Sequence, residues 1–275
     1  MSAALAKRRT DDAATLGRHL LFVVVFLFLL VPVLVSVTMA FDSRTYLGPF
    51  PPPDLSLQWV AKFFSDDYLL RGLWTSLLLA GASSVLAMLV GGLAAFGIER
   101  SRFPGRELVM AIFLSPLIVP GVILGFGLLL LFSRLTLLEG LPRLIAGHVL
   151  IAFPFCLRTT LASLVGIRKS LTEAALSLGA TEWQALWEIT FPLARTGVLA
   201  GGIFAFAVSM DDVAVALFLS DPQTYTLPIA LVGMMRANFD LTVAAASLIL
   251  LLVALLSTGL LLRCVDLGQG VYRRK

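Results

Sequence analysis

Residues 170–192 read SLTEAALSLGATEWQALWEITFP, and this stretch predicts two short helices that meet at a turn. Ser170 and Glu173 have the spacing of a capping box, in which the two side chains satisfy backbone amides at the start of the first helix. Gly179 can adopt the left-handed backbone conformation that ends this helix. Because Pro192 cannot donate a backbone hydrogen bond, we expect it to end the second helix.

The two predicted helices carry further local signals. Thr181 and Gln184 repeat the capping-box spacing at the start of the second helix. In the first helix, small and apolar residues recur at i, i+3, i+4 and i+7, which places them on one face. They are Leu171, Ala174, Ala175 and Leu178. A face this narrow can enter a groove on another protein, and the alternative is a helical hairpin that lies on the lipid headgroups.

The composition places the chain in a membrane. Of its 275 residues, 59% are hydrophobic and 14% are charged, and the mean hydropathy is +0.95. Soluble domains carry about 25% charged residues. The net charge of +4 comes from 21 basic and 17 acidic residues, an excess too small to indicate a nucleic-acid partner. Cys156 and Cys264 lie far apart in apolar segments, so neither a disulfide scaffold nor a thiolate metal site is indicated.

Six segments are long and apolar enough to cross a bilayer, which takes about 20 residues. Four of them contain no charged residue, whereas the fourth segment contains Arg158 and the fifth contains Asp211 and Asp212. The fold class that we predict is an all-α integral membrane protein with six transmembrane helices. The six segments are residues 20–40, 73–98, 108–133, 144–167, 196–220 and 241–262.

The distribution of basic residues predicts the orientation. Fifteen of the 21 Lys and Arg residues lie in the amino tail, in the loop 99–107, around the exit of the fourth segment and in the carboxyl tail. By the positive-inside rule, both termini are then cytoplasmic. We interpret the first segment as a retained helix rather than a cleaved signal peptide, because its apolar run is uninterrupted and lacks a clear cleavage site. The outer connection 41–72 opens with a proline-rich turn, after which apolar residues recur at helical spacing and predict a short interfacial helix. They are Leu57, Val60, Ala61 and Phe64.

The stretch 170–192 resembles the EAA loop of ABC-importer permeases. The resemblance rests on Glu173-Ala174-Ala175, on Gly179 followed by Ala180, on Ile189 and on Pro192. It implies a coupling helix that docks in a cleft of a cytoplasmic ATPase dimer. Phe191 and the pair Thr196-Gly197 depart from the usual pattern, but neither touches the Glu-Ala-Ala or Gly positions. Arg168 and Lys169 serve either docking or membrane topology.

Three further motifs resemble the spermidine/putrescine branch of binding-protein-dependent permeases: LWTSL at 73–77, PLIVPGVILG at 116–125 and SMDDV at 209–213. The resemblance implies a type I importer in a bacterial cytoplasmic membrane. Such an importer has two six-helix permease subunits, two ATPase subunits and an extracytoplasmic solute-binding protein. The resemblance implies that the second permease subunit is not identical to this chain. The chain has no P-loop, so ATP and Mg belong to the partner ATPase and this subunit is not an enzyme.

The resemblance also divides the chain. Residues 1–71 are expected to form a cytoplasmic tail, the first transmembrane helix and an extracytoplasmic connection. Residues 72–263 are expected to form the permease core of five helices, with the coupling loop at 166–195. Residues 264–275 are expected to form a second cytoplasmic tail.

Asp211 and Asp212 are candidate solute ligands, because a charge inside a span costs at least a few kcal/mol and rarely faces lipid. Asp211 is about 15 residues into the fifth segment, so a regular helix would place it about 22 Å from the cytoplasmic edge. Adjacent side chains on a helix point about 100° apart, which predicts one solute ligand and one structural residue. The alternative is an internal salt bridge with Arg158, which could instead extend toward the headgroups.

Pro116, Pro120 and Gly121 predict a bend or a local unwinding in the third segment. Freed carbonyl groups at Pro120 and Gly121 could line the solute pathway, or the bend could serve packing alone. An acidic residue sometimes follows the second proline in polyamine permeases, and this chain has Gly121 there. Import of another small organic solute, such as an amino-acid derivative or an opine-like compound, therefore stays open.

His19 and His148 form no ligand cluster, and we interpret each as a satisfied polar residue rather than a metal ligand.

Two alternatives to an importer subunit remain. A secondary transporter could use the acidic pair as a proton or cation site without ATP. A membrane scaffold would need none of these residues for transport.

Overall fold

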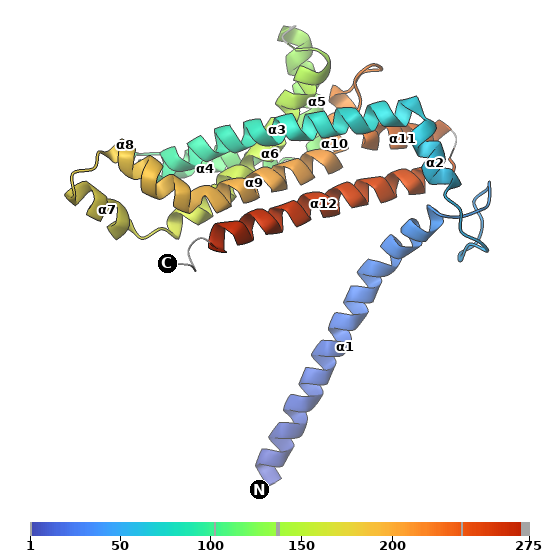
Figure 1. Ribbon diagram of the computed structural model, residues 1–275, viewed down its shortest axis with the longest axis horizontal. Coiled ribbons are helices and arrows are strands. Elements are labelled where there is room, and N and C mark those ends of the chain that lie inside the picture. Colours follow the sequence, from blue (N-terminus) through green and yellow to red (C-terminus); the bar gives the residue numbers. More distant parts are fainter. Residues whose placement is uncertain (1, 102, 136–137, 238, 271–275) are drawn as a thin grey trace. The chain divides into compact units, whose positions relative to one another are not determined.

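The computed structural model describes residues 2–101, 103–135, 138–237 and 239–270 (Figure 1). These residues are helical apart from their connections, and the one extended pairing among them is an isolated bridge between Asp42 and Leu55. The all-α prediction is confirmed. The chain forms two compact units, one of residues 1–65 with 238–249 and the other of residues 66–237 with 250–275.

Among the described residues, four helical segments are long and apolar enough to cross a membrane, and a fifth is added if one bent helix pair counts as a span. They include α1 (Ser2–Met39), α3 (Asp67–Arg100) and α6 (Gly140–Val165), which contain the first, second and fourth predicted segments. The structure therefore supports a multi-pass membrane protein. The sixth predicted segment lies in α12 (Thr242–Gly270), of which residues 242–257 form a shorter apolar stretch, so the count of six stays a prediction. Most of the predicted tail 264–275 continues α12, and residues 271–275 lie outside the described residues.

The third predicted segment is bent, as its prolines predict. It consists of α4 (Arg106–Leu114), the 3-10 turn η1 (Ser115–Leu117) and α5 (Gly121–Leu135), and the chain direction changes by 100° between the two halves. Proline removes a backbone donor and clashes with the preceding turn, so the helix stops before Pro120 and restarts at Gly121.

The fifth predicted segment is not one helix, and this prediction was wrong. Helix α9 (Phe191–Asp211) ends at the acidic pair, and the short helix α10 (Ala214–Leu219) follows. The apolar composition continues through both helices, so hydropathy gives no sign of the break. A further helix, α11 (Leu227–Ala237), was also missed because it is too short for a span.

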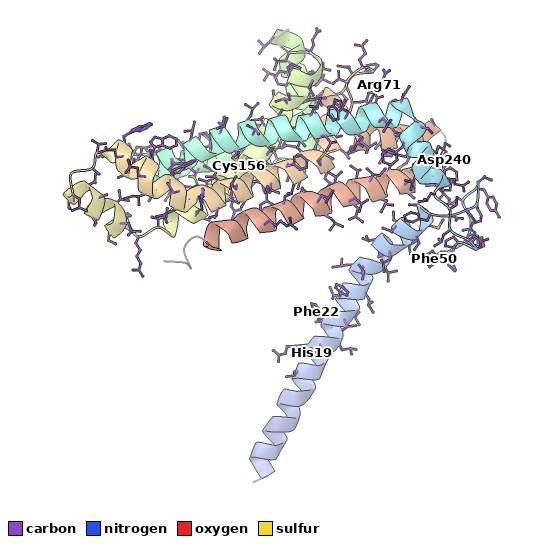
Figure 2. All side chains as sticks on the ribbon, viewed as in Figure 1. His19, Phe22, Phe50, Arg71, Cys156 and Asp240 are labelled. Carbon is purple, nitrogen blue, oxygen red and sulfur yellow. The ribbon has the colours of Figure 1, made fainter. Side chains whose placement is uncertain are left out.

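Helices α3, α6 and α9 form the core of the second unit and make its most extensive contacts. Their interface is built from small residues, which allow close helix approach where lipid supplies no hydrophobic drive. A Cβ atom at Gly91 would lie 3.1 Å from the carbonyl oxygen of Phe153 and 3.0 Å from the amide nitrogen of Leu157. Cys156, seen on α6 in Figure 2, is buried beside this contact, whereas the side chain of Cys264 is outside the described residues.

The first unit contains α1 and the predicted interfacial helix, α2 (Gln58–Ser65). The buried side chains of α2 are Trp59 and Phe63, whereas Leu57 and Phe64 of the predicted apolar face are exposed. The short helix is confirmed, and contact of that face with the membrane interface stays a prediction. The Gln58 side-chain amide donates to the carbonyl oxygen of Asp42, 3.0 Å away, and ties the helix to the turn before it. This tie fixes the start of α2, and its one-sided burial agrees with an interfacial helix.

The close approach of α3 and α6 makes a testable prediction at Gly91. Gly91→Ala should destabilise the protein by about 1–3 kcal/mol, because the new methyl group meets backbone atoms that cannot move aside. Gly97→Ala on the same helix is the matched control, since a Cβ there meets no atom within 4 Å. Thermal unfolding of the detergent-purified variants measures both, and equal melting temperatures would contradict the packing.

Candidate functional site

The acidic pair lies where the backbone leaves the helix. Asp212 has φ −69° and ψ 126°, an extended conformation, and the next helix begins two residues later. Its Oδ2 atom accepts hydrogen bonds from the amides of Val215 at 3.0 Å and Ala216 at 2.9 Å. Asp212 therefore acts as an N-terminal cap of α10, as aspartate commonly does. The regular-helix geometry predicted for the pair does not apply.

The two aspartates have different surroundings. Asp211 is exposed, whereas the Asp212 side chain is only 12% exposed and is held by backbone amides. Arg158 is exposed and makes no ion pair with either aspartate among the described residues, so the predicted alternative of an Arg158 salt bridge was wrong. The Asp212 carboxylate is thus held by backbone hydrogen bonds, whereas the exposed Asp211 carboxylate is accessible to a ligand.

Helix α10 is packed tightly against the restart of the bent third segment. A Cβ at Gly121 would lie 2.9 Å from the Cβ of Ala214, and one at Gly125 would lie 3.0 Å from the Cα of Val215. The bend at Pro120–Gly121 and the break at Asp212 are therefore neighbours, although about 90 residues separate them in sequence. The structure thus brings Gly121 next to Ala214, two residues beyond Asp212.

Helix α6 supports the other side of α10. Gly147 faces Leu219 so closely that a side chain there would overlap it. At the end of α10, the Arg143 guanidinium donates to the carbonyl oxygen of Leu219 at 3.0 Å and forms an ion pair with Asp221 at 3.3 Å. Sequence reasoning missed Arg143, because its partners are more than 70 residues away and no local pattern marks them.

A buried polar cluster lies behind the break. Nδ1 of His148 lies 2.8 Å from the Ser209 hydroxyl, which lies 3.0 Å from the Ser83 hydroxyl. All three side chains are buried. Nε2 of His148 has no hydrogen-bond partner and lies 3.8 Å from Oδ2 of Asp212. The prediction that His148 is a satisfied polar residue holds at Nδ1 and fails at Nε2.

The first helix of the loop 170–192 is α7 (Lys169–Ser177), and the predicted Ser170–Glu173 capping box is absent. The helix begins two residues earlier than that box requires, with Arg168 at the capping position, so Ser170 lies inside the first turn. Gly179 ends the helix as predicted, with φ +92°. The Gly179 amide donates to the carbonyl oxygen of Leu176, and the Ala180 amide donates to the carbonyl oxygen of Ala175, both at 3.0 Å. These two bonds form the Schellman motif that commonly ends a helix.

The second helix, α8 (Glu182–Ala185), has the predicted Thr181–Gln184 capping box. Pro192, however, does not end it, and this prediction was wrong. A π-helical turn, η2 (Leu186–Thr190), connects α8 to α9, and the Phe191 amide donates five residues back to Leu186. The wider turn lets the backbone continue, and Pro192 occupies the first turn of α9, where a missing donor costs little.

The loop presents its small-residue face outward. Leu178 is 90% exposed and Leu171 is 46% exposed, and Glu173 and Ala174 are also exposed. Beside it lies a polar cavity of about 450 Å³ with charged groups of both signs. Its lining includes Glu99, Arg100, Arg106, Lys169 and Glu173. An exposed apolar face next to charged groups of both signs is suited to contact with another protein.

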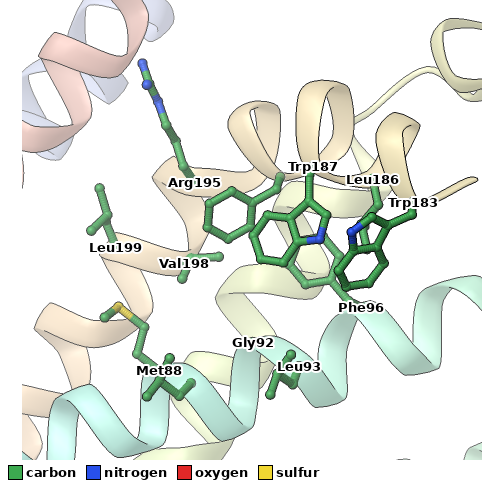
Figure 3. A pocket seen from close by; sticks show the side chains of 12 residues that line it. Met88, Gly92, Leu93, Phe96, Trp183, Leu186, Trp187, Arg195, Val198 and Leu199 are labelled. Carbon is green, nitrogen blue, oxygen red and sulfur yellow. The ribbon is translucent and has the colours of Figure 1, made fainter. Parts of the chain in front are cut away.

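A second cavity, of about 460 Å³, is almost wholly apolar (Figure 3). It lies between α3 and the segment that runs from α8 into α9, where the Trp187 ring lies 5.0 Å from the Phe191 ring. Arg195 is the one charged residue in the lining of this cavity. A lining of this kind offers almost no polar group that could bind a small charged solute.

A family model described as the binding-protein-dependent transport system inner membrane component matches residues 87–266, about two thirds of the chain. The chain belongs to this family. The family comprises permease subunits of ABC importers, which are not enzymes, because the ATPase is a separate subunit.

Curated relatives of this permease include two from one functional group. The spermidine/putrescine transport system permease protein PotC of Shigella flexneri is 30% identical over 249 residues, which are 90% of this chain and 94% of the relative. The putrescine transport system permease protein PotI of Escherichia coli (strain K12) is 29% identical and covers 82% of each chain. The permease is thus related to these proteins over nearly its whole length.

Solved structures show the fold of the permease. A bacterial ABC transporter for import of the acidic polysaccharide alginate gives a TM-score of 0.73 at 20% identity and covers 97% of this chain and 99% of that chain. The MetNI methionine ABC transporter gives a TM-score of 0.59 at 19% identity, and the match covers 73% of this chain and 95% of that chain. The architecture is that of the membrane subunits of ABC importers.

The cap on α10 makes a prediction about the acidic pair. Asp212→Ala in the permease should lower its stability by about 0.5–2 kcal/mol, because two amides of α10 lose their acceptor. Asp211→Ala should leave the melting temperature unchanged, since the exposed Asp211 side chain makes no such bond. Thermal unfolding in detergent compares the two variants, and an equal loss in both would refute the distinction.

Proposed function

We propose that this permease forms the translocation pathway of an ATP-driven importer for a polyamine such as spermidine or putrescine. The observation that carries the proposal is the exposed carboxylate of Asp211 at a helix break, in a chain related to PotC and PotI over most of its length. A carboxylate in an apolar bundle attracts an ammonium group strongly, because the surroundings screen the charges little.

Asp211 acts as the solute ligand, and Asp212 maintains the backbone. Asp212 already accepts two amide hydrogen bonds, so a passing ammonium group gains less from it. The bend at Pro120 and Gly121 interrupts the neighbouring helix beside this break. The carbonyl oxygen of Pro120 accepts from the amides of Ile123 and Leu124, so the expectation that the bend frees it for the solute was wrong. Solute recognition therefore concentrates where two helices are broken.

The loop 166–195 couples this pathway to the ATPase. Glu173, Ala174 and Ala175 form the contact, and Gly179 with Ala180 makes the turn that lets α7 protrude. Ile189 and Pro192 lie where η2 passes into α9. ATP-driven closure of the ATPase dimer moves this contact, which shifts the equilibrium between inward-open and outward-open states.

The complete importer contains partners that supply the remaining functions. They are a dimeric ABC ATPase that binds ATP and Mg, a second and non-identical permease subunit, and an extracytoplasmic solute-binding protein. One structurally similar transporter is described in complex with an alginate pentasaccharide-bound periplasmic protein, which supports the last partner. In this arrangement the permease has six spans, with both termini cytoplasmic, in a bacterial inner membrane. Residues 1–71 precede the core 72–263, and residues 264–275 form the second tail.

Relatives of the permease are not all named for polyamines. The molybdate/tungstate transport system permease protein WtpB of Thermococcus kodakarensis is 26% identical over 60% of this chain, so the family is not confined to cationic solutes. Gly121 also supplies no second acidic group at the bend. The alternative function is import of another small organic solute, such as an amino-acid derivative or an opine-like compound, by the same mechanism.

The substrate prediction uses the permease reconstituted with its ATPase, partner permease and binding protein. Spermidine and putrescine should be taken up, and Asp211→Asn should raise the KM for uptake about 10- to 100-fold, the cost of one charge-assisted hydrogen bond. Asp54→Asn, in the exposed outer connection, is the matched control and should leave the KM unchanged. Failure of polyamines to be taken up or to compete would overturn the polyamine assignment.

The coupling prediction concerns Gly179. Gly179→Val should abolish ATP-dependent uptake while leaving the amount of permease in the membrane unchanged, because a β-branched residue disfavours a φ of +92°. Gly179→Asn is the matched control, since asparagine tolerates this conformation and should retain most of the uptake. Undiminished uptake by Gly179→Val would favour an ATP-independent secondary transporter.

A further inference from the structure

The buried cluster behind the acidic pair has a hydrogen-bond arrangement that determines where its protons lie. The Ser83 hydroxyl lies 2.6 Å from the carbonyl oxygen of Leu79 and 3.0 Å from the Ser209 hydroxyl. The Ser209 hydroxyl in turn lies 2.8 Å from Nδ1 of His148. Three contacts therefore share the two hydroxyl protons and whatever proton the imidazole carries.

The proton positions follow from the one group that cannot donate. The carbonyl oxygen of Leu79 is only an acceptor, so that contact uses the proton of Ser83. The contact between the two serines then uses the proton of Ser209. The remaining contact requires Nδ1 of His148 to carry a proton and donate it to Ser209. Any other arrangement leaves one of the three contacts without a proton.

This arrangement leaves Nε2 of His148 facing Asp212. His148 is 0% exposed, Nε2 has no hydrogen-bond partner, and the Asp212 oxygen nearest to it is 3.8 Å away. A bare imidazole nitrogen and a carboxylate oxygen are both acceptors, and burying two acceptors face to face is costly. A single proton, on Nε2 of His148 or on the Asp212 carboxylate, makes one of the two groups a donor and the other an acceptor.

We propose that His148 is a positioning residue for the acidic pair: it donates from Nδ1 to Ser209 and holds one proton jointly with Asp212. The joint proton neutralises the charge that Asp212 would otherwise add inside the bundle. Asp212 then remains the cap of α10, and Asp211 is the one charged carboxylate at the break. This inference rests on the proposed function for the role of Asp211 as solute ligand.

The other charged groups on the packed elements do not serve Asp212. On α6, Arg143 pairs with Asp221 at the far end of α10, and Arg158 is exposed without an ion pair among the described residues. Asp211 adds a like charge next to Asp212, which makes a second negative charge there more costly. Within the part of the chain that the structure describes, His148 is therefore the one basic group that forms a pair with Asp212.

Nitrogen NMR of the membrane-reconstituted full chain with isotope-labelled histidine tests the proton positions. The chain has two histidines, so His19→Asn leaves His148 as the single signal source. We expect Nδ1 to be protonated, and Asp212→Asn to shift the Nε2 resonance while Asp211→Asn does not. An unprotonated Nδ1, or an Nε2 resonance indifferent to Asp212→Asn, overturns the proposal. This measurement needs no solute, so it decides the proposal even if polyamine uptake fails.

Uptake by the reconstituted importer tests the positioning role. His148→Asn keeps an amide at the place of Nδ1 but cannot reach Asp212, and we expect it to lower the maximal uptake rate about tenfold with little change in KM. When Asp212→Asn is already present, adding His148→Asn should reduce the maximal uptake rate by a factor at least about fivefold smaller than in the wild type, because the effects of two residues in contact are not additive. In the Asp211→Asn background it should persist. His148→Gln, whose amide reaches the place of Nε2, should recover part of the rate.

Multiplicative losses for His148→Asn and Asp212→Asn would show that the two residues act independently and would overturn the positioning role. Wild-type importer that transports no polyamine would instead overturn the proposed function, while the NMR result would still decide the state of His148. The two failures are therefore distinguishable.

Discussion

The acidic pair depends on one constraint: a helix that stops inside an apolar bundle leaves backbone amides that neither lipid nor water satisfies. At the break after α9, Asp212 meets this constraint by accepting from the amides of Val215 and Ala216. Its carboxylate is therefore committed to the backbone. The exposed Asp211 is left with its charge available, so the difference between two adjacent aspartates follows from a backbone requirement and not from their chemistry.

Close packing keeps the short helix α10 in place. Gly121 and Gly125 of α5 approach it on one side and Gly147 of α6 on another, each near enough that a Cβ atom would crowd the neighbouring atoms. A helix of six residues has little stability of its own, and these contacts hold it. The same packing places the bend at Pro120 beside the break, so two irregular backbone segments share one location. Irregular backbone at membrane depth is tolerated where protein or a cavity surrounds it.

The sequence allowed prediction of features that depend on local chemistry. Apolar length located α1, α3 and α6, the prolines indicated the bend before Gly121, and the Thr181–Gln184 capping box and the turn at Gly179 followed from spacing alone. Other features depend on contacts distant in sequence. Apolar residues lie on both sides of Asp211 and Asp212, so the segment reads as one span despite the break, and the partners of His148 come from two other helices. Hydropathy averages over these details, and one sequence contains no record of which helices meet.

The continuity of one helical segment connects the two candidate sites. Residues 182–211 form a single apolar helical stretch of 30 residues, interrupted only by the π-helical turn η2. Its first turn belongs to the exposed loop, and its last residue is Asp211. At 1.5 Å per residue it extends about 45 Å, enough to cross the bilayer. Under the proposed coupling, a displacement of the loop would reach the acidic pair along this continuous helical stretch and would need no chain of side-chain contacts. The π-helical turn lies at the loop end, where Pro192 would otherwise interrupt the helix, so the irregularity preserves this continuity.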